Sequence, residues 1–215
     1  MDGADVTVLV VGCDPGTTSG WAAVVDGLLV ASGTLEADRM GLFRVLRDAR
    51  DKHPADERHC VVEEQFLPRQ HATKEGKAEA TADEAVADVS NRFRAVAKVI
   101  QIRGWWEEAA ALLGYQVAEP VLASAWQGPM GVIKLANMKF KGQPVPRKKA
   151  ARWLVEQMTG RKMGADEADA VCIARWFAVE LQRRQATPQL PLGDGGVTKA
   201  KAKKARTSAS VAPKK

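Results

Sequence analysis

Residues 6–35 read VTVLVVGCDPGTTSGWAAVVDGLLVASGTL, and this stretch decides the fold. Its first part, residues 6–13, is a continuous apolar run rich in β-branched residues, which is typical of a buried strand. Asp-Pro-Gly at residues 14–16 ends that strand in a turn. Gly27 then separates two further predicted strands, residues 20–26 and 28–35. Because a short Gly-containing turn joins them, these two strands predict an antiparallel hairpin that follows the first strand.

Helices and strands alternate over the rest of the predicted domain. A short apolar strand, residues 60–62, ends at acidic residues, and another, residues 115–119, is closed by Pro120. Apolar residues at helical spacing predict four helices: residues 38–52, 83–113 with an interruption at Gly104, 147–159 and 165–185. Three leading strands followed by such alternation predict an α/β fold, a mixed β-sheet with its first three strands antiparallel and helices on its faces.

The length and composition indicate one globular domain. The chain has 215 residues, of which 46% are hydrophobic, enough for one sizeable core. Its longest apolar run, residues 6–13, is far shorter than the roughly 18–20 residues of a membrane span, and the acidic N-terminus lacks the features of a signal peptide. Three widely spaced cysteines inside apolar runs suggest buried thiols in a reducing compartment. We therefore expect a cytoplasmic protein.

The excess positive charge lies at the C-terminus. Residues 186–215 hold seven of the 32 Lys and Arg and one of the 26 acids, which leaves 25 charges of each sign in residues 1–185. This tail is rich in Pro, Gly, Ser, Ala and Lys and lacks aromatics, so we expect it to be disordered. Such an arm either attracts polyanions such as DNA or serves as a solubilising tail. The predicted domains are therefore residues 1–185 and a Lys-rich tail, residues 186–215.

Four acidic residues stand at the ends of predicted elements. Asp14 follows the first strand and Glu63 follows the fourth, so adjacent parallel strands would bring both carboxylates to one edge of the sheet. Asp166 and Asp169, three residues apart, share one face of the last helix, whereas Glu167 is rotated about 100° away. Asp14 alone is equally a turn former and Asp166 an ordinary helix N-terminal acid. The four together are harder to explain without a common function.

Convergent carboxylates without His or Cys partners suit hard cations such as Mg²⁺ or Mn²⁺. Two such ions about 3.5–4 Å apart can clamp the attacking water and the leaving oxygen of a phosphodiester. Since the carboxylates would repel one another without a cation, the cluster predicts a requirement for metal.

Three sequence blocks resemble a known family. The blocks are VVGCDPGTTSGWAAV at residues 10–24, VVEEQF at residues 61–66 and ADEADAVCIA at residues 165–174. In this order and spacing they are similar to the RuvC-like Holliday junction resolvases, which have the RNase H-like fold. The resemblance spans residues 7–180. It implies a homodimeric endonuclease that cuts four-way DNA junctions with two Mg²⁺ or Mn²⁺ ions per site, leaving 5′-phosphate and 3′-hydroxyl ends.

The family's metal-binding catalytic acids fall on four positions of this chain. They match Asp14, Glu63 (with Glu64 as the register alternative), Asp166 and Asp169.

The family's basic catalytic residue and its junction-stacking aromatic also have counterparts. The basic residue matches Lys148, with Lys149 beside it, and the aromatic matches Phe66. We expect both lysines to contact DNA as well. An exposed aromatic ring beside an acidic cluster can stack on an unpaired base, although Phe66 could equally be a core residue. Further basic residues that could contact DNA phosphates, or simply form a solvated face, follow Phe66: Arg69, Lys74 and Lys77.

The chain also departs from the family pattern. Residues 67–103 are longer and more charged than the family leads us to expect, which puts the geometry of the dimer in doubt, and the basic tail is additional. These departures look more like a phage-encoded member, acting in the cytoplasm of a bacterium or an infected host.

Three alternatives remain beside junction resolution. GCDPGTTSG at residues 12–20 also resembles the phosphate loop of actin- and Hsp70-like ATPases, although no second such loop is found. A non-catalytic junction-binding protein could keep the fold without the metals. A broader nuclease of the same fold, acting on RNA–DNA hybrids or other branched DNA, has the same metal chemistry and cannot be separated from a resolvase by sequence.

Overall fold

The computed structural model describes residues 6–64, 82–140 and 143–186. Within these ranges, the side chains of residues 82–89 and Phe140 are not described. Four residues predicted to bind DNA lie outside the described residues: Phe66, Arg69, Lys74 and Lys77. The predicted tail lies outside as well, apart from Ala186, which closes the last helix.

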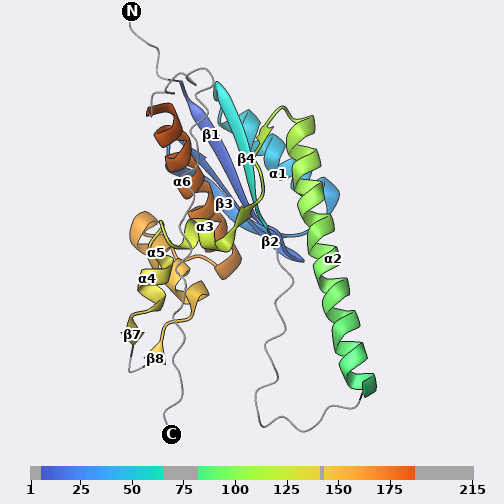
Figure 1. Ribbon diagram of the computed structural model, residues 1–215. Coiled ribbons are helices and arrows are strands. Elements are labelled where there is room, and N and C mark those ends of the chain that lie inside the picture. The colour runs from blue at the N-terminus through green and yellow to red at the C-terminus, as the bar shows by residue number, and fades with distance from the viewer. Residues whose placement is uncertain (1–5, 65–81, 141–142, 187–215) are drawn as a thin grey trace, which may run out of the picture.

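A mixed sheet forms the centre of the molecule (Figure 1). Its strand order is β3-β2-β1-β4-β5, and β6 also pairs with β4. Strand β1 is antiparallel to β2 and parallel to β4, and β2 is antiparallel to β3. The strand bounds are β1 Val8–Asp14, β2 Thr18–Val25, β3 Leu28–Glu36, β4 Glu57–Glu64, β5 Gln116–Val117 and β6 Val121–Leu122. The predicted fold class, with its antiparallel leading strands, is confirmed.

Helices cover both faces of this sheet. Helix α6 crosses one face, with α5, α3 and α4 beside it, while α1 and α2 lie on the other (Figure 1). The helix bounds are α1 Arg39–Lys52, α2 Ala82–Leu112, α3 Ala123–Gln127, α4 Val132–Ala136, α5 Arg147–Thr159 and α6 Ala165–Ala186. A separate short pair, β7 Lys139–Phe140 and β8 Gln143–Pro144, lies between α4 and α5 along the chain.

The continuous apolar run of β1 is explained by its position between two cores. Successive side chains of a strand point to opposite faces. Val10 accordingly packs on the α6 side and Leu9 and Val11 pack on the α1–α2 side, and all three are fully buried. A strand with both faces covered needs apolar residues at every position, which is what the sequence shows.

The hairpin between β2 and β3 turns where the sequence predicts. Asp26 and Gly27 both have positive φ angles, 48° and 79°, as the tight turn between two right-twisted strands requires. The Asp26 side chain also accepts a hydrogen bond from the Val8 backbone over 2.9 Å. The turn therefore fixes both the hairpin and the start of β1.

Two glycines let α6 lie directly on the backbone of the sheet. A Cβ added at Gly12 would lie 2.6 Å from the backbone nitrogen of Ala174, and one at Gly20 would lie 2.0 Å from the carbonyl oxygen of Asp166. Neither site has room for a side chain. The close approach brings the first turn of α6 beside the end of β1, because Gly20 is paired with Asp14.

Two predicted details of the middle of the chain are wrong. Helix α2 continues through Gly104 without interruption. Here the cost of glycine, about 1 kcal/mol relative to alanine, is outweighed by burial of Ile102 and Trp106 on either side of it. The strand predicted over residues 115–119 is also shorter. The chain pairs with β4 twice, through β5 and β6, on either side of Pro120.

None of the helices that the structure describes has the length and apolar character to span a membrane.

Candidate active site

Asp14 is the last residue of β1 and is held by the turn that follows it. The Ser19 hydroxyl donates to the carbonyl of Gly16 over 3.0 Å, and the Gly16 backbone N–H donates back to Ser19 over 3.3 Å. Ser19 is fully buried and Asp14 is only 9% exposed. The turn therefore fixes a carboxylate at the end of a buried strand.

Glu63, on the neighbouring strand β4, lies at the same end of the sheet as Asp14. It lies near the end of β4, which is parallel to β1, and is 7% exposed. The indole Nε1 of fully buried Trp126, in α3, donates to Glu63 Oε1 over 2.9 Å. Glu64 is more exposed. Of the two candidates in the sequence, the structure places Glu63 beside Asp14.

The other two acids of the site, Asp166 and Asp169, lie in the first turns of α6. Asp169 is 8% exposed and Asp166 is half-buried. Asp166 Oδ1 accepts a hydrogen bond and ion pair from Lys148 Nζ over 2.8 Å. Glu167 points elsewhere and accepts from the Ser32 hydroxyl on β3 over 2.8 Å. The expected division of these three helix acids, two on one face and one away from it, is confirmed.

The carboxylates lie close enough for each to affect the pKa of its neighbours. Burial, then the charges of Glu63 and Asp166, raise the pKa of Asp14 to about 8. Burial and the charge of Asp14 raise the pKa of Asp169 to about 7. Burial also raises the pKa of Glu63, against the lowering effect of the Trp126 hydrogen bond. Buried like charges of this kind are concentrated at functional sites.

The acids do not converge tightly enough to hold an ion as they stand. In the part of the chain that the structure describes, no three His, Cys, Asp or Glu side chains form such a group. Trp126 and Lys148 bind two of the four carboxylates instead. The chemistry of the donors still suits Mg²⁺ or Mn²⁺, since all are carboxylates, and a cation would relieve the repulsion that raises their pKa values.

Lys148, in the first turn of α5, is the basic residue of the site. Its hydrogen bond to Asp166, together with the charges of Asp166 and Asp14, raises its pKa, so it is fully protonated at neutral pH. Lys149 points away along α5, and its Nζ lies 5.3 Å from the centre of the Trp153 ring. The two adjacent lysines thus have different surroundings: Lys148 binds Asp166, and Lys149 lies over Trp153.

Two contributors to the site were not found from the sequence. Trp126 lies in a segment without clear periodicity, and nothing in its neighbourhood predicts that its indole meets Glu63. Gly20 permits α6 to contact β2, yet in the sequence it looks like an ordinary strand glycine. The only signal is its place six residues after Asp14, within one of the three blocks quoted above.

The order of the strands and the place of the acids define the class of fold. Three antiparallel strands, a fourth strand parallel to the first, and a C-terminal helix that carries acids to the end of β1 make up an RNase H-like α/β fold.

Comparison with known proteins narrows this class. No protein-family model and no curated protein matches the sequence. Among solved structures, the chain matches T. thermophilus RuvC in complex with Holliday junction substrate, at 17% identity and a TM-score of 0.51, over 82% of this chain and 96% of that one. It also matches a Thermus thermophilus RuvC structure, at 19% identity and a TM-score of 0.50, with the same coverage. The chain therefore has a RuvC-like fold, as the sequence blocks predict.

Proposed function

We propose that this protein is a metal-dependent endonuclease that cuts branched DNA, with the four-way junction as its substrate. The observation that carries the proposal is the meeting of four carboxylates and one lysine, from β1, β4, α5 and α6, at one end of a RuvC-like sheet. One of the two RuvC structures that it resembles is bound to a Holliday junction. Both the fold and the site are therefore consistent with this substrate.

The carboxylates are the proposed metal ligands. Asp14, Glu63, Asp166 and Asp169 would hold Mg²⁺ or Mn²⁺, two ions in the proposed active form, which activate water and stabilise the leaving oxygen in phosphodiester hydrolysis.

The other residues position these groups or bind charge. The Trp126 indole holds one oxygen of Glu63 and so fixes its orientation. The Lys148 ammonium, held beside Asp166, supplies a positive charge where the phosphate must approach and favours the negative charge that develops on it. The turn at residues 14–16 keeps Asp14 at the strand end.

The test compares three proteins on three labelled substrates with Mg²⁺. Wild type should nick a four-way junction at opposed strands, leave ends that a ligase reseals, and spare a linear duplex and an RNA–DNA hybrid. Asp14→Asn should bind the junction at least as tightly but cut nothing, because one carboxylate facing the phosphates is neutralised. Glu167→Gln is the matched control, since Glu167 binds Ser32 and not the cluster, and should cut normally.

Other outcomes would change the assignment. If wild type also cuts the RNA–DNA hybrid or many branched forms, the protein is a nuclease without specificity for four-way junctions. If wild type binds the junction tightly but does not cut it with either Mg²⁺ or Mn²⁺, the protein is a non-catalytic junction-binding protein. Loss of binding in Asp14→Asn would give this residue a structural role.

A further inference from the structure

A basic groove adjoins the acidic cluster on the side of α5. It has a volume of about 500 Å³ and is open to solvent. Helix α5, the loop after it and the start of α6 supply its lining. The charged and aromatic residues that line it are Lys148, Lys149, Arg152, Trp153, Glu156 and Lys162. Four cations against one acid are notable in a chain whose residues 1–185 carry equal numbers of each sign.

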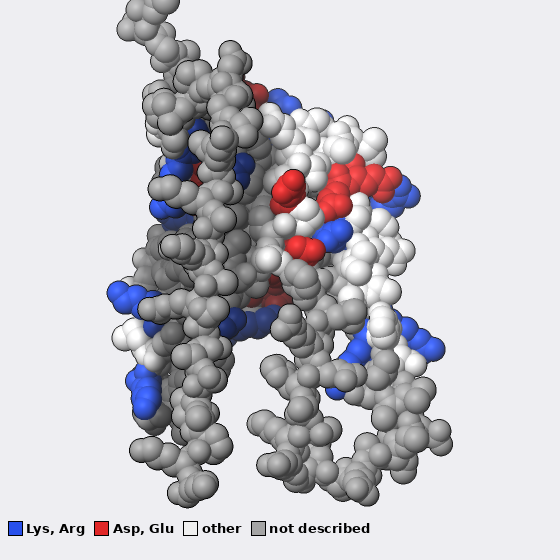
Figure 2. All heavy atoms as spheres, in the orientation of Figure 1, with Lys and Arg blue, Asp and Glu red and all other residues white. Residues whose placement is uncertain are grey.

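The groove is continuous with the proposed active site. Lys148 lines it and also binds Asp166, and Ala165, the residue before Asp166, forms part of its wall. A polymer held across the acidic cluster would therefore extend into the groove. Figure 2 adds that, on the face it shows, Lys and Arg side chains lie at the lower left, over α4 and β7, with no acidic side chain in view there.

The groove has a defined shape. Arg152 Nε donates to the backbone carbonyl of Met163 over 3.0 Å, which ties the loop carrying Lys162 to α5. Met163 is itself buried. Lys149, in α5, and Lys162, in the loop after α5, thus line the groove from two different segments of the chain.

Trp153 gives the groove its second chemical property. Trp153 is 36% exposed, although tryptophan is usually well buried, and Lys149 Nζ lies 5.3 Å from its ring centre. Cations along a channel with an accessible aromatic ring are the features that bind a single nucleic acid strand, through its phosphates and by stacking on a base. A paired base in a duplex has both faces covered by its neighbours, so an unpaired nucleotide fits this ring better.

We propose that this groove binds an unpaired DNA strand next to the site of cutting, with phosphates on Lys149, Arg152 and Lys162 and a base stacked on Trp153. The proposal rests on the proposed nuclease function, since it places the groove along the path of the substrate strand. The sequence already predicts that Lys148 and Lys149 contact DNA, and the groove adds Arg152, Trp153 and Lys162 on the α5 side of the site. The other predicted basic residues, Arg69, Lys74 and Lys77, lie outside the described residues.

The experiment measures binding of the full-length protein to a fluorescent oligothymidylate in EDTA, so that no cutting occurs. Trp153→Ala should bind at least about fivefold more weakly, the low end of the effect of one stacked base, and Trp153→Phe should restore most of the affinity. Lys162→Ala should lower the slope of affinity against salt by about 0.7, the contribution of one phosphate contact on a single strand.

Arg161→Ala is the matched control. Arg161 is the exposed neighbour of Lys162, carries the same charge and does not line the groove, so its loss should leave affinity and salt slope as in wild type. Equal losses in Arg161→Ala and Lys162→Ala would show a diffuse positive field and overturn the proposal. Unchanged affinity in Trp153→Ala, with thermal unfolding as in wild type, would also overturn it, as would binding to a duplex that is tighter than to the single strand.

The two proposals can fail separately. If the protein binds the oligonucleotide through Trp153 and Lys162 but cuts no DNA, the proposed nuclease function is refuted, and the proposed binding of a single strand in the groove still holds. If the protein cuts junctions but Trp153→Ala and Lys162→Ala bind the oligonucleotide like wild type, the proposed role of the groove is refuted and the proposed nuclease function still holds.

Discussion

At the scale of single residues, Asp14 couples stability to pH. In the folded protein its pKa is about 8, against about 3.9 in an unfolded chain. Between these values the folded state binds more protons than the unfolded state, so the free energy of unfolding falls as pH rises from about 4 to about 8. The metal-free site is thus a source of instability at neutral pH, which is expected where carboxylates are kept for function.

Asp14→Asn should therefore stabilise the metal-free protein, increasingly so toward pH 8. We expect the gain over wild type to grow by at least about 1.4 kcal/mol between pH 4 and pH 8, the equivalent of one pKa unit. Urea unfolding in EDTA at both pH values measures it, with Glu167→Gln as the control. A variant that loses stability equally at both pH values would contradict the repulsion between the acids.

Trp126 acts as a positioning residue for Glu63. Its hydrogen bond lowers the pKa of a carboxyl that burial raises. In Trp126→Phe the bond is lost and the pKa of Glu63 should rise, which moves the acid limb of the pH–rate profile for nicking to higher pH. On that limb, the rate should fall about tenfold for each unit of the shift, and at higher pH it should be unchanged. A merely structural role would reduce the rate equally at every pH. Trp105→Phe, on the other side of the sheet, should leave the profile unchanged.

At the scale of elements, contact between α6 and the sheet sets the geometry of the site. A Cβ at Gly20 would overlap the Asp166 carbonyl, a backbone atom that cannot turn aside. Gly20→Ala should therefore push the start of α6 away from β2 and abolish cutting, with a loss of about 3 kcal/mol or more in stability.

Gly33→Ala provides the comparison for Gly20→Ala. It lies on β3 opposite Trp21, and its Cβ would meet only the Trp21 side chain at 3.2 Å, which can shift. Denaturant unfolding and nicking assays on both variants measure the difference. Similar behaviour of the two would mean that contact of α6 with β2 does not determine the site.

Elements were predictable from the sequence where local pattern decides the structure. The Asp-Gly turn, the buried run of β1 and the acids at strand and helix ends follow from periodicity and turn chemistry, and the structure brings Asp14, Glu63, Asp166 and Asp169 together. The failures depend on tertiary contacts. Burial beside Gly104 keeps α2 intact, and Trp126 meets Glu63 only because α3 packs against α6.

At the scale of the whole molecule, the basic tail should dominate non-specific DNA binding. Residues 187–215 hold all seven of the tail's Lys and Arg, whereas residues 1–185 are neutral overall. Deleting them should reduce the salt slope for duplex DNA by up to about 6, because each neutralised phosphate contributes about 0.9. A tail of equal length with Gln at the seven positions is the control and should behave like the deletion. Unchanged affinity at every salt concentration would leave the tail a solubilising role.

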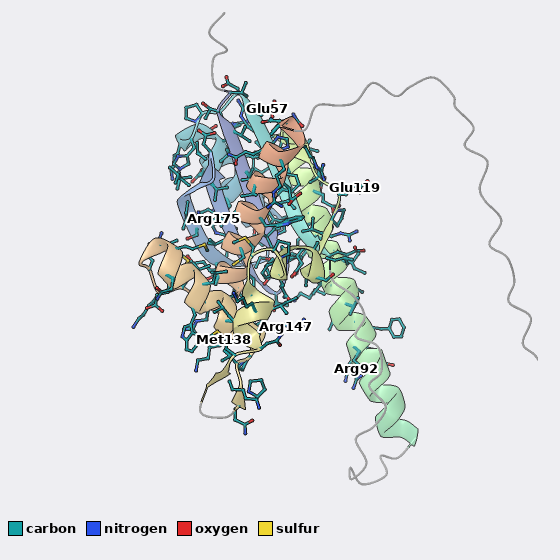
Figure 3. The ribbon with its side chains drawn as sticks, turned by 60° about the vertical axis from the view of Figure 1, so that its left-hand side comes forward. Glu57, Arg92, Glu119, Met138, Arg147 and Arg175 are labelled. Atoms are coloured by element: carbon teal, nitrogen blue, oxygen red, sulfur yellow. The ribbon has the colours of Figure 1, made fainter. Side chains whose placement is uncertain are left out.

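The length of α2 bears on assembly. Its 31 residues span roughly 46 Å at 1.5 Å per residue. Figures 1 and 3 show its N-terminal half, which carries Arg92, extending beyond the sheet. Residues 90–101 are mostly exposed there, including Phe93 at 59% and Ile100 at 48%. A helix without tertiary packing is marginal in water, so we expect this half to pack against a partner.

A second copy of the chain is the partner we expect on α2, because a two-fold symmetric dimer can place one site at each of two opposed junction strands. Phe93→Glu with Ile100→Glu should raise the dimer dissociation constant at least tenfold, since each loses about 1.5–3 kcal/mol of apolar burial. Sedimentation equilibrium measures it. Leu112→Glu, the same change at an exposed position at the other end of α2, should leave the dimer intact. If Leu112→Glu alone dissociates the dimer, the interface lies at the C-terminal end of α2, next to α1. If wild type is a monomer and still nicks both strands, no dimer is needed for the proposed function.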